Sequence, residues 1–149
     1  MSRAPRVLVS DRQRALRLDR RRLARDLGTV LRRVRFPGAL SLSLVGDREM
    51  RRLHARYSGD DTPTDVLAFP LPSPAGGLPS GEVVVSVETA VREARARRLR
   101  PRGEVLLYAV HGILHLCGED DHDPARARRM DRRTLRLLGG LGVRHTIER

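Results

Sequence analysis

The run His111-Gly-Ile-Leu-His-Leu-Cys-Gly-Glu-Asp-Asp-His122 closes the most apolar stretch of the chain and holds three of its five histidines. Residues four apart on an α-helix differ by about 40° in direction and about 6 Å in height, so His111 and His115 share one face. The apolar residues around them predict a buried helix over 102–116. Two buried imidazoles need a ligand or hydrogen-bond partners, which indicates a metal site on this helix.

His122 is the candidate third ligand of this site. It follows Gly118, beyond the predicted end of the helix, on a loop that is able to bend back over the same face. Three nitrogen ligands leave a fourth coordination position open, as a hydrolytic zinc site requires. The alternative is a helix whose polar stripe happens to be histidine. We expect His111, His115 and His122 to bind one Zn²⁺, or another divalent transition metal that imidazole ligands suit.

Gly112 distinguishes this site from a zinc protease. The spacing resembles H-E-x-x-H, but glycine stands where the catalytic glutamate would be, which disfavours peptidase chemistry of that type. A glycine here also allows another backbone to approach closely. No catalytic residue is assigned from the sequence.

The remaining candidates around the site are weaker. Cys117 points away from His115 on a continuing helix, so it is interpreted as a small buried thiol rather than a fourth ligand. For the acidic run 119–121, support of a ligand's imidazole or contact with solvent is favoured over metal binding. His54 and His145 lie outside this cluster of histidine and acidic residues in the sequence and are predicted to be surface residues.

The net charge of +12 indicates an attraction to polyanions, of which nucleic acid is the commonest, although a solvated basic surface is the alternative. The single cysteine excludes an intramolecular disulfide. No segment approaches the ~20 apolar residues of a membrane span, so the expected location is the cytoplasm, with no membrane partner. With only four Tyr and Phe residues and no Trp, the core must consist of Leu, Val and Ala.

Hydrophobic periodicity predicts one domain over residues 1–149. Asp47 offers an N-cap and Pro124 suits a first helical turn. The order of elements indicates an α+β fold with a small mixed four-stranded sheet and about five helices. The predicted strands are 6–10, 40–45, 65–69 and 81–87, and the predicted helices are 11–33, 47–57, 88–99, 102–116 and 124–138, with a loop over 71–80.

Three segments match the patterns of one family. Residues 111–118 follow H-G-x-L-H-L-x-G, the start of a motif that ends in Y-D-H, and residues 81–88 are similar to a G-D-I-x-I-S-x-E strand that leads into a helix. Tyr57, Gly59, Asp61, Phe69, Pro70 and the run 63–67 match Y-R-G-K-D-x-P-T-D-V-L-S-F-P. In order and spacing these segments resemble the YbeY endoribonucleases, or rRNA maturation factors, over most of residues 40–138.

The resemblance implies a zincin-like α+β fold and a zinc ion held by His111, His115 and His122. It implies a single-strand-specific endoribonuclease that matures the 3′ end of 16S ribosomal RNA and contributes to ribosome quality control. A water molecule activated by the metal would attack the phosphodiester. The partners implied are single-stranded RNA, ribosomal RNA, the small ribosomal subunit and its assembly proteins.

Two positions depart from the family patterns. The family's last histidine lies ten residues after the first, whereas His122 lies eleven after His111, which we interpret as a one-residue insertion. The family's Arg and Lys in Y-R-G-K are Ser58 and Asp60 here. These replacements support an alternative function, a ribosome-associated RNA-binding assembly factor with a mainly structural metal. A third hypothesis is a hydrolase of a small molecule or peptide, which rests on the open coordination position alone.

Overall fold

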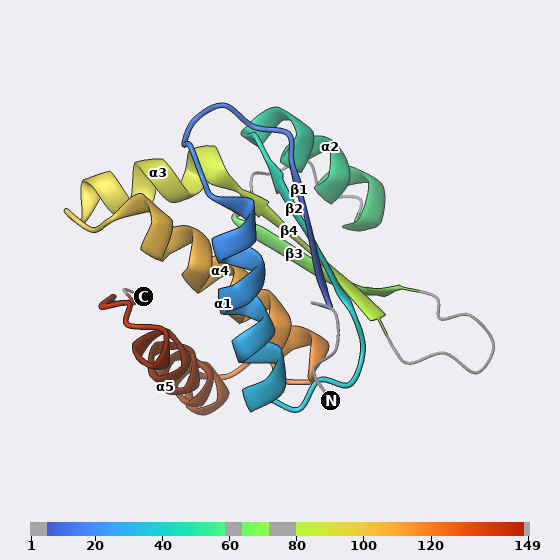
Figure 1. The fold of residues 1–149 in the computed structure, drawn as a ribbon, viewed down its shortest axis with the longest axis vertical. Coiled ribbons are helices and arrows are strands. Elements are labelled where there is room, and N and C mark those ends of the chain that lie inside the picture. Colours follow the sequence, from blue (N-terminus) through green and yellow to red (C-terminus); the bar gives the residue numbers. More distant parts are fainter. Residues whose placement is uncertain (1–5, 59–63, 72–79, 148–149) are drawn as a thin grey trace.

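The structure is a computed structural model that describes residues 6–58, 64–71 and 80–147. These residues form a four-stranded mixed sheet and five helices, so the predicted α+β fold is confirmed (Figure 1). The elements in chain order are β1 (Val7–Asp11), α1 (Arg20–Arg33), β2 (Leu40–Val45), α2 (Asp47–Ser58), β3 (Val66–Leu71), β4 (Ser80–Ser86), α3 (Val87–Ala96), α4 (Pro101–Leu116) and α5 (Pro124–Gly140).

The sheet has the order β1-β2-β4-β3. β1, β2 and β4 are parallel, with Leu42 opposite Val9 and Val83, whereas β3 is an antiparallel edge strand. Since successive side chains of a strand alternate between faces, each face buries a separate set of apolar residues. α1, α3, α4 and α5 lie on one side of the sheet and α2 lies on the other (Figure 1).

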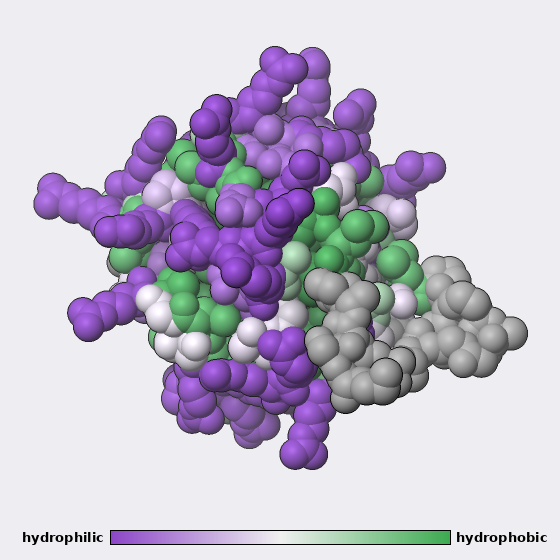
Figure 2. Space-filling view, viewed as in Figure 1, coloured by the Kyte–Doolittle hydropathy of each residue, from purple (hydrophilic) through white to green (hydrophobic). Residues whose placement is uncertain are grey.

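The larger core lies between the sheet and α1, α3, α4 and α5, and its side chains are mostly Leu and Val, as the composition predicts. A smaller cluster under α2 consists of Val45, Met50 and Val84, with Leu53, Leu67 and Phe69 packed against it. Hydrophilic side chains project over much of the visible surface (Figure 2). No helix among the described residues is long and apolar enough to cross a bilayer.

The first helix is shorter than the predicted 11–33, because it begins at Arg20. The side chain of Gln13 holds the preceding segment in an irregular turn, since it donates to Asp11 and Leu16 and accepts from the amides of Ala15 and Leu16. Asp19 then caps the helix by accepting from the amide of Arg22. Side-chain hydrogen bonds to the local backbone thus replace helical ones over 12–19.

Candidate metal centre

α4 is the helix that carries the site, and it is buried along most of its length. Pro101 occupies its first turn, where the missing amide proton costs nothing. At its other end Gly118 has a φ of 91°, the amide of Gly118 donates to the carbonyl of His115, and the amide of Glu119 donates to that of Leu114. This is a Schellman turn, and it sends the chain back along the helix toward His111.

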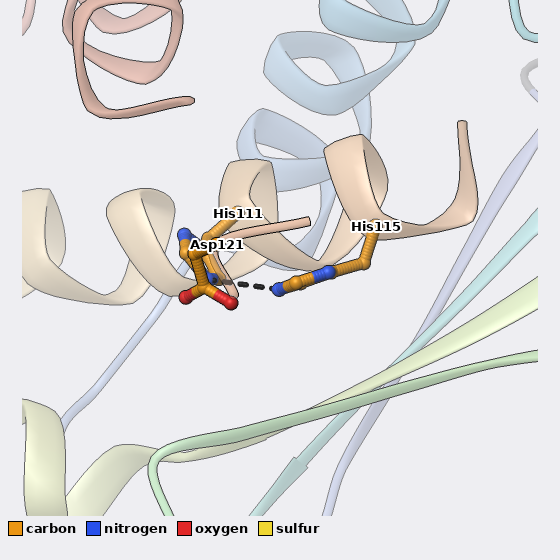
Figure 3. Close-up of side chains that lie close together, drawn as sticks. All are labelled: His111, His115 and Asp121. Carbon is orange, nitrogen blue, oxygen red and sulfur yellow. Dashed lines mark hydrogen bonds and ion pairs between the residues drawn. The ribbon is translucent and has the colours of Figure 1, made fainter. Parts of the chain in front are cut away.

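His111, His115 and Asp121 meet at this turn (Figure 3). The Nε2 atoms of the two histidines lie 3.0 Å apart, and Oδ2 of Asp121 lies 3.6 Å from Nε2 of His111. Nδ1 of His115 lies 3.0 Å from the carbonyl oxygen of Glu119, so that nitrogen donates and Nε2 keeps its lone pair toward the site. The three side chains are partly buried, with donor atoms all within 4.8 Å of one another.

These distances fit a first-row divalent metal. Nitrogen and oxygen ligands of Zn²⁺ lie about 2.0–2.2 Å from the ion, so two ligand atoms in a tetrahedral site are about 3.3 Å apart. The observed separations of 3.0 Å and 3.6 Å lie on either side of that value. Two imidazoles and one carboxylate are also a donor set that zinc and iron enzymes use. The group is therefore a candidate metal site.

The side chain of His122 does not lie in the group formed by His111, His115 and Asp121. Its side chain is 83% exposed, and its Nδ1 atom lies 3.7 Å from Oδ1 of Asp120 rather than in the group of potential ligands. Its assignment as third ligand stays a prediction. The backbone amide of His122 donates to Asp120 and, with the guanidinium of Arg126, lowers the pKa of that carboxyl.

Asp121 belongs to the acidic run for which the sequence disfavours metal binding, but its carboxylate lies in the group of potential ligands. It lies ten residues after His111, which is the spacing of the family's last histidine, whereas His122 lies eleven residues after. Counting without an insertion would have identified Asp121 as the equivalent position. The neighbouring Glu119 forms an ion pair with Arg133 of α5, which fastens the turn that carries Asp121.

Gly112 is required by packing rather than by chemistry. A Cβ atom here would lie 2.7 Å and 2.9 Å from the two methyl groups of Val83 and 3.3 Å from Cγ2 of Val66. The close approach is therefore made by side chains of the sheet and not by another backbone. A glutamate at this position would collide with β4, which explains why the protease signature is incomplete.

Two sequence interpretations near the site are wrong. Cys117 is exposed rather than buried, because it is the C-cap residue that follows the last residue of α4 and is no longer part of the packed helix. His145 is buried rather than on the surface, with a side chain only 1% exposed, because the C-terminal segment folds back and brings its Nε2 atom to the buried Glu104 of α4. His54 is half-buried on α2.

A pocket of about 800 Å³ adjoins the candidate metal site and has both His111 and Asp121 in its wall. Its lining also includes Glu104, which is 2% exposed and lies 2.5 Å from Arg97, the C-cap residue of α3, and 2.5 Å from His145. Asp65 contributes a wall at the start of β3, where enclosure by the pocket and the charges of Glu104 and Glu93 raise its pKa. Asp65 is itself an exposed residue, so this desolvation is partial.

The family's Y-R-G-K segment falls largely outside the described residues. Asp60 belongs to residues 59–63, and Ser58 is described only as the last residue of α2. The predicted loop over 71–80 also lies mostly outside the described part of the chain, which resumes at Ser80.

Comparison with known proteins identifies relatives along most of the chain. The family model for Endoribonuclease YbeY matches residues 9–142. Endoribonuclease YbeY of Anaeromyxobacter sp. (strain Fw109-5) is 44% identical over 110 residues, or 73% of this chain and 57% of the relative, so the match spans little more than half of the relative's length. Endoribonuclease YbeY of Anaeromyxobacter dehalogenans (strain 2CP-C) is 39% identical over 137 residues, 91% of this chain and 71% of the relative.

One solved structure shows the same fold. The solution structure of TM1509 from Thermotoga maritima matches with a TM-score of 0.61 and 23% sequence identity, and the match covers 91% of each chain. At this level of identity the comparison bears on architecture alone.

Proposed function

Because the chain belongs to the Endoribonuclease YbeY family, we propose that it is a metal-dependent endoribonuclease that hydrolyses single-stranded RNA. The observation that carries the proposal is the convergence of His111, His115 and Asp121 beside a pocket. The net charge of +12 supports a polyanionic substrate.

We propose that His111 and His115 bind one Zn²⁺ and that a residue of the following turn completes the ligand set. The positions in the fold favour Asp121 as that third ligand, and His122 is the alternative that the motif predicts. A divalent cation in this position supplies a Lewis acid that activates water and neutralises charge on the scissile phosphate.

The chain's own residues prepare this chemistry. The carbonyl of Glu119 fixes the ring of His115 with Nε2 toward the site. The ion pair of the buried Glu104 with Arg97 ties the C-terminal end of α3 to α4, and both residues line the pocket beside His111. Such fixed surroundings would align the phosphodiester for attack.

In the cell we propose that the substrate is ribosomal RNA, with 16S 3′-end maturation and ribosome quality control in the cytoplasm as the role. The family resemblance and the basic charge support this assignment. The small ribosomal subunit and its assembly proteins are the corresponding partners.

A second candidate is an RNA-binding assembly factor whose metal is mainly structural. The replacement of the family's Arg and Lys by Ser58 and Asp60 favours it, because a basic pair near the substrate is lost. This candidate predicts co-sedimentation with small ribosomal subunits, loss of folding without metal and RNA turnover at background.

The test is cleavage of a labelled single-stranded RNA by the purified protein, with and without a chelator. The His115→Ala variant should lose both the bound metal and the cleavage, whereas the matched His54→Ala variant, altered at a histidine outside the group, should keep both. Cleavage that persists in His115→Ala and in chelator contradicts the proposal. Metal content is measured by elemental analysis of each variant.

A further inference from the structure

The rings of Tyr57 and Phe69 form a stacked pair on the surface. Their centroids lie 4.7 Å apart with an interplanar angle of 29°. Tyr57 is 59% exposed. Among the described residues, the large hydrophobic side chains that are exposed are those of Tyr57 and Leu8. In a chain with two Tyr, two Phe and no Trp, this pair is half of all the aromatic rings.

Phe69 holds the Tyr57 ring in place from below. It packs against the apolar cluster of Val45, Met50 and Val84 under α2. Tyr57 therefore has one ring face against Phe69 and most of its remaining surface toward solvent. A ring ordered in this way loses little conformational entropy when a second flat group stacks on it.

The charge around the pair suits a polyanion. α2, which ends next to Tyr57, carries four exposed arginines against two acidic residues. Three of the four, Arg48, Arg51 and Arg52, also line a groove of about 710 Å³, and they outnumber the two acidic side chains in its lining, Asp47 and Glu88. No ion pair among the described residues involves any of these arginines, which are Arg48, Arg51, Arg52 and Arg56.

The stacked pair lies close to the candidate metal site along β3. Val66, at the start of this edge strand, lines the pocket that contains His111, and Phe69 lies three residues further on the opposite face. Three residues of a strand span about 10 Å. A few nucleotides that pass over the open edge of β3 would connect the two sites.

We propose that Tyr57, backed by Phe69, is a stacking platform for an unpaired base of the RNA that reaches the metal site. The inference rests on the proposed function, because it takes single-stranded RNA as the ligand. Aromatic rings beside a basic groove are how proteins hold single strands without reading their sequence, since every base has a stacking face. The exposed ring supplies the base contact and the arginines of α2 supply the backbone contact.

The first experiment measures binding without cleavage. A fluorescein-labelled oligoadenylate is titrated with chelator-treated protein, and its anisotropy is recorded. Tyr57→Ala should weaken binding about 5- to 100-fold, the loss expected for one base–aromatic stack, whereas Tyr57→Phe should bind like the unaltered protein. Leu8→Ala is the matched control, because it removes an exposed apolar side chain from β1 at the other edge of the sheet and should leave binding unchanged.

Inorganic polyphosphate separates stacking from charge, because it carries phosphates without bases. In competition with the labelled RNA, polyphosphate should bind Tyr57→Ala and the unaltered protein with the same affinity. If Tyr57→Ala weakened the binding of polyphosphate as much as the binding of RNA, the substitution would disturb the basic surface. That result would overturn the stacking proposal. A melting curve for each variant verifies that α2 is still folded.

Fluorescence gives a second readout. The chain has no Trp, so Tyr108→Phe leaves Tyr57 as the sole tyrosine fluorophore. Oligoadenylate should quench its emission, and polyphosphate should not. Unchanged emission at saturating RNA, or equal RNA affinities for Tyr57→Ala and the unaltered protein, would overturn the proposal. If RNA binding depended on Tyr57 but no RNA were cleaved in the presence of metal, the nuclease function would be rejected and the stacking proposal would be retained.

Discussion

The Nε2 atom of His111 lies 3.0 Å from the Nε2 atom of His115, and the carbonyl oxygen of Glu119 lies 3.0 Å from the other ring nitrogen of His115. A carbonyl oxygen can only accept, so we assign the proton of the neutral ring to Nδ1 and the lone pair to Nε2. Two ring nitrogens this close are stabilised by a shared proton or a shared cation. The turn at Gly118 therefore determines which nitrogen of His115 is offered to the site.

The identity of the third ligand follows from a pair of neighbouring substitutions. Asp121→Ala should reduce metal affinity by more than about 100-fold, because it removes a donor from the group, whereas His122→Ala should retain about one ion per chain. Elemental analysis after dialysis against a weak chelator measures both. The reverse outcome, with metal lost from His122→Ala alone, would restore the histidine of the motif as the ligand.

Gly112→Ala should destabilise the fold by about 1–3 kcal/mol, because the added methyl group overlaps Val83. The free energy of unfolding in urea measures the loss. Gly139→Ala in α5 is the control, because its new methyl group meets nothing within 4 Å and should be neutral or stabilising. Val83→Ala in the Gly112→Ala background should recover part of the loss; if it adds its full separate cost instead, the steric explanation fails.

Glu104→Ala should destabilise the protein by about 3 kcal/mol, because Arg97 and His145 would keep their buried positions without the carboxylate that pairs with them. Asp26→Ala removes the partner of Arg102 in a more exposed pair and should cost at most about 1 kcal/mol. Chemical denaturation of both variants gives the comparison. Similar losses of unfolding free energy in the two variants would mean that Glu104 is not an important buried partner of Arg97 and His145.

Stability should fall in acid partly through Asp47. Burial raises the pKa of this carboxyl, but hydrogen bonds from Ser86, Arg92 and Thr89 outweigh it and hold the pKa below its usual value. As the pH falls, the unfolded chain therefore takes up this proton before the folded chain does. The stabilisation is present above the unfolded pKa of about 4 and is lost as the pH falls through the folded pKa. Asp47→Asn should reduce the difference in unfolding free energy between pH 7 and pH 3, and an unaltered difference would exclude this role.

The sequence by itself determined the order of strands and helices and the pairing of His111 with His115. Both follow from local periodicity, because the pitch of a helix fixes which residues share a face and strand alternation fixes which side is buried. The resemblance to the YbeY family was readable for the same reason, since its motifs are short runs with fixed spacing. The start of α1 was misplaced because the side chain of Gln13 competes with the helix for backbone hydrogen bonds.

Only the tertiary structure decided which group of the turn approaches the two histidines. The left-handed φ of Gly118 and the ion pair between Glu119 and Arg133 direct Asp121 inward, and neither is visible in the residue spacing. The burial of His145 and the stacking of Tyr57 on Phe69 likewise join segments far apart in the chain. Such contacts depend on how elements pack across the core, which a linear pattern does not specify.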